Sequence, residues 1–178
     1  AIEDIANNDT ARLMGQRMFN NNCAVCHGQG GVGAYGFPNL ADNDWLYGGD
    51  GATIKATLLY GRKGAMPPWL DILGEDGVRN VTSYVLSLSG QEVNAQAAAQ
   101  GQTTYQAMCV ACHGSEGKGN LTLGAPNLTD NIWLYGGSFE QIAHTIRQGR
   151  NGVMPSHGEL LSEDKINLIS GYVYSLSN

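Results

Sequence analysis

Apolar residues recur at helical spacing near the end of each half of the chain. The two stripes consist of Val81, Tyr84, Val85 and Leu88, and of Ile169, Tyr172, Val173 and Leu176. The pattern also predicts helices over residues 10–20, 53–59 and 140–147. Residues 91–100 are rich in Ala and Gln and suit the start of another helix. No alternating strand pattern competes, so the expected fold class is all-α.

Loops rich in glycine separate these predicted helices. Glycine makes up 25 of the 178 residues, which is about twice its usual share. Residues 61–65 and 149–153 both begin with glycine and are expected to be flexible turns. Ser138 and Gln141 form a capping-box pair that marks the start of the 140–147 helix.

The chain is a tandem repeat. Cys109 follows Cys23 by 86 positions, and beyond that motif the offset becomes 88. Residues 38–49 and 126–137 are identical at ten of twelve positions. This predicts two homologous domains, 1–90 and 91–178. Because domains of this size bury little apolar surface alone, we expect a bound group to complete each interior.

All four cysteines lie in a repeated Cys-x-x-Cys-His string, at residues 23–27 and 109–113. This string is the attachment signature of c-type haem, in which two thiols bond the haem edge and the histidine binds the iron. The expected cofactors are therefore two covalent haem c groups. Their attachment and proximal-ligand residues would be Cys23, Cys26, His27, Cys109, Cys112 and His113.

Three other interpretations use the same cysteines. A zinc site is one, although 82 residues lie between Cys26 and Cys109 and the histidines would be unexplained. Thioredoxin-like redox pairs are another, but no alternating strand–helix pattern surrounds them. Two structural disulfides are the third, though a bridge within one helical turn stabilises a fold poorly.

Met66 and Met154 are the candidates for the second axial ligand. Among five methionines only these two recur in both repeats, and each follows the histidine of its own repeat by about 40 residues and precedes a proline. Iron held by His and Met is the electron-transfer arrangement and leaves no open position. Core packing is the alternative role. His144 and His157 do not recur, so ligation by two histidines is the minority alternative.

Other recurring residues are candidate supporting groups. Proline carbonyls are placed to accept the histidine Nδ1 proton, aromatic tips to reach haem propionates, and arginines to neutralise propionate charge. Plain packing or a solvated surface is the alternative for each. These residues are Pro38, Pro126, Trp45, Tyr47, Trp133, Tyr135, Arg62 and Arg150.

Each half resembles a class I cytochrome c domain along its whole length. Gly15 with Phe19, and Gly101 with Tyr105, look like the family's contact between first and last helices. The string Pro-Asn-Leu-x-Asp-Asn-x-Trp-Leu-Tyr-Gly-Gly in both halves is similar to that of the di-haem subunit (CcoP or FixP) of cbb-type haem–copper oxidases. The resemblance implies electron relay from a donor cytochrome c toward membrane oxidase subunits that reduce oxygen. The chain itself would be an electron carrier, not an enzyme.

The biological setting is less constrained by the sequence. The family subunit normally has an N-terminal membrane helix, and no apolar run here is long enough to cross a bilayer. The chain is thus expected to be a soluble fragment, a processed form or a free-standing relative. A free soluble di-haem shuttle of the c-four group is the alternative. Haem attachment implies a periplasmic location, and the net charge of −6 argues against a nucleic-acid partner.

Overall fold

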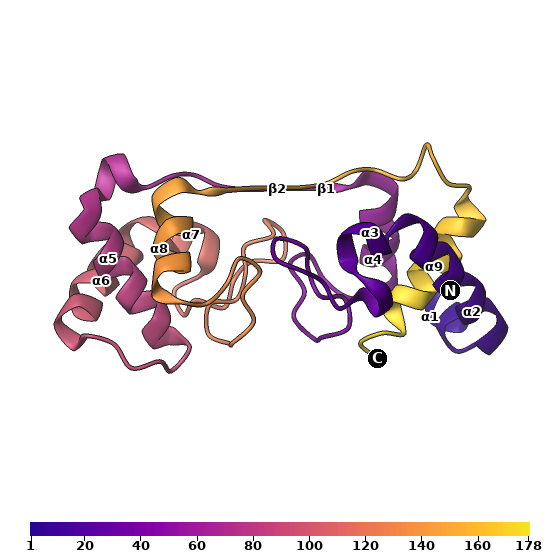
Figure 1. Ribbon diagram of the computed structural model, residues 1–178, viewed down its shortest axis with the longest axis horizontal. Helices are drawn as coiled ribbons and strands as arrows, with labels where there is room; N and C mark the ends of the chain where they lie inside the picture. The colour runs from indigo at the N-terminus through magenta and orange to yellow at the C-terminus, as the bar shows by residue number, and fades with distance from the viewer. The chain divides into compact units, whose positions relative to one another are not determined.

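The computed structural model describes all 178 residues, and most lie in short helices (Figure 1). A two-stranded sheet of β1 and β2, which the all-α expectation missed, is also present. The elements are α1 Ile2–Ala6, α2 Asp9–Asn22, α3 Ala24–His27, the 3-10 turn η1 Gln29–Gly31, α4 Gly51–Tyr60, β1 Arg62–Met66, α5 Leu70–Leu88, α6 Ala95–Met108, α7 Val110–His113, α8 Phe139–Gln148, β2 Arg150–Met154 and α9 Glu163–Tyr174.

Side-chain caps explain where several of these helices begin. Asn8, Asp50 and Asn94 each accept a hydrogen bond from a backbone N–H in the first turn of α2, α4 and α6. The expected capping box of Ser138 and Gln141 is present at α8. These caps satisfy backbone donors that have no partner inside the helix. The helices predicted at 10–20, 53–59 and 140–147 are therefore found, each slightly longer than expected.

The chain folds into two compact units, and neither unit is a sequence repeat. Unit 1 consists of Ala1–Lys63 and Gly152–Asn178, and unit 2 of Gly64–Asn151. The expected boundary near Gly90 lies inside unit 2, because α5 and α6 pack against each other on either side of it. The compact units thus differ from the expected domains 1–90 and 91–178.

Unit 1 is built around the packing of α9 on α1, α2 and α4. The rings of Phe19 on α2 and Tyr172 on α9 lie 5.3 Å apart between centroids. Gly15 allows the close approach, because a Cβ there would contact the carbonyl group of Leu168. The expected contact between a first and a last helix is therefore present, but the last helix comes from the other repeat.

Unit 2 repeats this arrangement with α5 packed on α6 and α8. Tyr84 of α5 and Tyr105 of α6 have ring centroids 5.1 Å apart. A Cβ on Gly101 would contact the Asn80 carbonyl group, as Gly15 does with Leu168 in unit 1. Here too the two helices come from different repeats, since α5 ends the first repeat and α6 begins the second.

Strands β1 and β2 carry the chain between the two units. Gly61 lies against the Met154 carbonyl and Gly149 against the Met66 carbonyl, so the strands run in opposite directions. Both glycines end a helix with φ near +70° (70° and 71°), a conformation that favours glycine. The flexible turns expected over residues 61–65 and 149–153 are instead extended over most of their length.

Candidate functional site

Each Cys-x-x-Cys-His string forms one short helical turn, α3 in unit 1 and α7 in unit 2. The backbone N–H of His27 donates to the carbonyl of Cys23 at 3.0 Å, and His113 donates to Cys109 at the same distance. A single turn therefore holds two thiols and an imidazole together, as the sequence predicted.

The four cysteines are free thiols. Burial raises the pKa of Cys23 to about 11, with a smaller contribution from Cys26, and the pKa of Cys109 rises to about 11 in the same way. A protonated thiol is a weak nucleophile in disulfide exchange. No group of three or more His, Cys, Asp or Glu side chains is arranged to hold a metal ion. The disulfide and zinc alternatives therefore find no support here.

A proline carbonyl orients each histidine. The Nδ1 atom of His27 lies 3.0 Å from the Pro38 oxygen, and that of His113 lies 3.3 Å from the Pro126 oxygen. When Nδ1–H donates to the carbonyl, Nε2 keeps its lone pair for a metal. Burial lowers the pKa of His113, although its Pro126 hydrogen bond acts in the opposite direction. Both contacts expected from the sequence are present.

Glycine makes these contacts possible. The Gly33 N–H donates to the His27 carbonyl at 2.7 Å, and the Gly119 N–H to the His113 carbonyl at 2.9 Å. A Cβ on Gly33 would lie 2.6 Å from the Phe37 oxygen, and its φ is +75°. Only a residue without a side chain lets the proline segment come back this close.

The two methionines lie in the opposite units from those that the repeat spacing indicated. Met154 packs against the buried cluster of unit 1, beside Cys23 and Trp45. Met66 packs against the cluster of unit 2 with Cys109 and Trp133. Each methionine therefore shares a unit with the Cys-x-x-Cys-His string of the other repeat, because the chain changes unit within β1 and β2.

The arginines stay with their own repeat. The Arg62 guanidinium lies 4.7 Å from the centre of the Tyr47 ring, and the Arg150 guanidinium lies 4.0 Å from that of Tyr135. Both distances fit a cation–π contact. Arginine and tyrosine are thus brought together in both units, while a role toward propionates stays a prediction.

Two threonines belong to the same arrangement and were missed from the sequence. The Nε of Arg62 donates to the Thr57 hydroxyl at 2.8 Å, and Arg150 to the Thr145 hydroxyl at 2.9 Å. Thr57 and Thr145 are 88 positions apart, so the repeat offset was a usable signal.

The remaining histidines differ in their surroundings. His144 is exposed on α8. His157 follows Met154 in unit 1, and its Nδ1 is buried without a hydrogen-bond partner. Neither residue recurs in the other repeat, and ligation by either stays an untested alternative.

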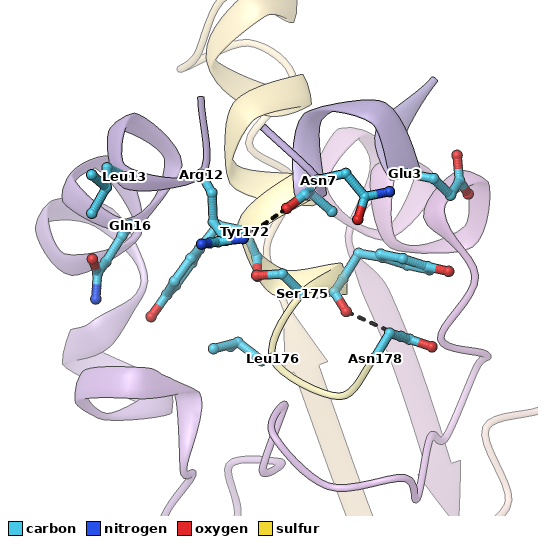
Figure 2. Close-up of a pocket in the computed structure, with 11 residues that line it drawn as sticks. Glu3, Asn7, Arg12, Leu13, Gln16, Tyr172, Ser175, Leu176 and Asn178 are labelled. Atoms are coloured by element: carbon cyan, nitrogen blue, oxygen red, sulfur yellow. Dashed lines mark hydrogen bonds between the residues drawn. The ribbon is translucent and has the colours of Figure 1, made fainter. Parts of the chain in front are cut away.

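A separate pocket lies in unit 1 among α1, α2 and the C-terminal residues (Figure 2). Arg12 donates to the Ala6 carbonyl at 3.2 Å, and Asn178 to the Tyr174 carbonyl at 3.0 Å. None of the candidate cofactor residues lines this pocket.

Comparisons with known proteins point to one family. The chain matches the family model described as cytochrome c oxidase, cbb3-type, subunit III, over residues 11–85 and 96–173. It is 46% identical over 176 residues to the CcoP subunit of a cbb3-type oxidase from Rubrivivax gelatinosus, covering 98% of this chain and 58% of that protein. It is 45% identical over 188 residues to the FixP subunit from Azorhizobium caulinodans, covering 98% and 64%.

A third relative, the CcoP subunit from Cereibacter sphaeroides, is 41% identical over 177 residues, covering 91% of this chain and 60% of that protein. The chain therefore spans roughly three fifths of the length of these curated relatives. Within the 178 residues, no helix combines the length and apolar character needed to cross a membrane.

Proposed function

Because the chain belongs to the family of cbb3-type cytochrome c oxidase subunit III, we propose that it carries electrons through two covalently bound haem c groups. The observation that carries this proposal is the repeated turn in which two free thiols and a carbonyl-oriented imidazole lie together. The residues fit the group: the Cys pairs are unbridged, and the histidine Nε2 is left available for iron.

The cysteines would attach the cofactor by addition. Each thiol adds across one vinyl group, so that a carbon–sulfur bond forms, the vinyl double bond becomes single, and the thiol hydrogen moves to the neighbouring carbon. No oxidant is needed for this step. Cys23 and Cys26 serve unit 1, and Cys109 and Cys112 serve unit 2.

The proposed axial ligands are one histidine and one methionine in each unit. The iron of a bound haem supplies a one-electron centre that alternates between ferrous and ferric states. The chain's own residues keep the ligands fixed through that change. His27 and His113 are held through Nδ1 by proline carbonyls, and both methionines lie at the end of a hydrogen-bonded strand.

We also propose supporting roles for the arginine and aromatic residues of each unit. Arg62 over Tyr47 and Arg150 over Tyr135 place a fixed positive charge on each unit. Such a charge stabilises propionates, which would otherwise add to the net charge of −6. Trp45 and Trp133 would shield the cofactor from water while packing on the core.

The named relatives suggest the biological context. They are subunits of cbb3-type oxidases. We infer that this chain passes electrons from a donor cytochrome c toward membrane oxidase subunits, on the periplasmic side of the membrane. The free shuttle of the c-four group is less favoured, because these relatives are oxidase subunits.

Paired cysteine variants test this function in membranes that contain the complete oxidase. The chain with Cys23→Ser and Cys26→Ser should carry one haem by mass spectrometry, and so should the chain with Cys109→Ser and Cys112→Ser. Each should slow oxygen uptake from reduced cytochrome c, whereas Gln102→Ala, exposed on α6, should not. Unchanged oxygen uptake in both one-haem chains would overturn the electron-transfer role.

A further inference from the structure

We propose that each haem is held jointly by the two sequence repeats, His27 with Met154 and His113 with Met66. This pairing rests on the proposed haem ligation and specifies it further. It is the reverse of the pairing that the spacing within each repeat suggests.

In unit 1, the chain around Met154 is fixed to residues of the first repeat. The Ser156 hydroxyl donates to the Leu59 carbonyl at 2.6 Å, and the His157 N–H donates to the Leu58 carbonyl at 2.9 Å. Both acceptors lie near the end of α4. These bonds hold the segment that follows Met154 in the unit that contains His27.

In unit 2, the equivalent segment after Met66 is fixed to the second repeat. The Trp69 N–H donates to the Ile146 carbonyl of α8 at 3.0 Å. A Cβ on Gly149, at the end of α8, would lie 2.8 Å from the Pro68 nitrogen. Met66 is therefore confined to the unit that contains His113.

The helices that follow the methionines strengthen this placement. Helix α9 lies on α2 and α4, and α5 lies on α6 and α8. Ion pairs join the same partners: Lys55 to Glu163 in unit 1 and Glu75 to Arg147 in unit 2, both with N–O distances of 2.8 Å. Pairing within each repeat would require α5 and α9 to leave their cores, which include the fully buried Val78, Val81, Ile166 and Ile169.

The repeat itself explains why the exchange costs little. Exchanging equivalent elements between homologous units preserves the same kinds of contact. Tyr172 meets Phe19 as Tyr84 meets Tyr105, so α5 and α9 present similar faces. The consequence is that neither repeat alone contains both axial ligands of any one haem.

Single-haem chains test the pairing by spectroscopy. With Cys23→Ser and Cys26→Ser, only the haem at Cys109 and Cys112 is retained. In that background Met66→Ala should abolish the sulfur-to-iron charge-transfer band of the oxidised protein, whereas Met154→Ala should keep it. Chains with Cys109→Ser and Cys112→Ser should show the opposite pattern. Loss of the band with the methionine of the same repeat would overturn the crossed pairing.

The parent single-haem chains separate this inference from the proposed function. If they carry a haem but show no sulfur band, methionine ligation itself is wrong, and the crossed pairing falls with it. If they carry no haem at either site, the proposed function fails.

A cleavage experiment on the two-haem chain does not depend on these variants maturing. A protease site inserted between the exposed residues Gly90 and Gln91 lies in the connection between α5 and α6. After cleavage, the two fragments should elute together in native gel filtration and keep both sulfur bands, and they should separate in denaturant. Elution as two independent one-haem fragments, each with its sulfur band, would refute the crossed pairing.

Discussion

Replacing Gly15 by alanine should destabilise unit 1 through the contact between α2 and α9. A Cβ at this position would meet the Leu168 carbonyl oxygen and would lie 2.9 Å from the Cβ of Tyr172. The obstacle is helix backbone, which cannot rotate away as a long side chain can. The two helices must therefore move apart, which also disturbs the packing of Tyr172 on Phe19.

The expected size follows from two opposing effects. Alanine in place of glycine stabilises a helix interior by about 1 kcal/mol. Overpacking a tight contact costs about 1–3 kcal/mol, and a rigid carbonyl places this site near the upper end. The net destabilisation is then about 2 kcal/mol. For a chain of this length, that loss lowers the melting temperature by about 4–8 °C.

Thermal unfolding followed by circular dichroism measures this effect. Gln16→Ala, exposed on the same helix, is the matched control and should change stability by less than about 0.5 kcal/mol. If Gly15→Ala left the melting temperature unchanged or raised it, the close packing of α2 on α9 would be refuted.

Three further variants test other parts of the account. Tyr105→Phe removes a hydroxyl that donates to the Gly114 carbonyl at 2.8 Å, so denaturant unfolding should show a loss of about 1 kcal/mol, and no loss would contradict the bond. Arg147 holds the pKa of Glu75 below its ordinary value, so the stabilisation is present at neutral pH and is lost as pH falls through the folded-state pKa. The melting-temperature difference between the native chain and Glu75→Gln should therefore shrink in acid, and a difference that grew would refute the sign. Met66→His should lower the potential of only one haem in a redox titration, that of unit 2, and unchanged potentials would exclude Met66 as a ligand.

Local features of both repeats were predictable from the sequence. The Cys-x-x-Cys-His turns follow from covalent spacing, and the carbonyls of Pro38 and Pro126 meet the histidines as expected. The helix starts at Asp50 and Ser138 follow from capping chemistry. Each of these features depends on residues close together in the chain, and neighbouring residues restrict one another strongly.

The exchange between repeats was not predictable in the same way. Gly15 accepts a helix as closely as Gly101 does, and α5 and α9 carry similar apolar stripes. The sequence pattern is therefore the same whether a last helix packs on its own repeat or on the other. The strands also gave no signal, because Arg-Lys-Gly-Ala-Met has no apolar alternation.

The most direct test of the crossed haem sites uses the native holoprotein in its reduced, diamagnetic state. Methionine ε-methyl groups labelled with carbon-13 can be assigned with Met66→Leu and Met154→Leu, and nuclear Overhauser contacts then show which haem each methyl faces. The Met154 methyl should contact the haem bonded to Cys23 and Cys26, and the Met66 methyl the haem bonded to Cys109 and Cys112. Contacts from each methyl to the haem of its own repeat would contradict the account.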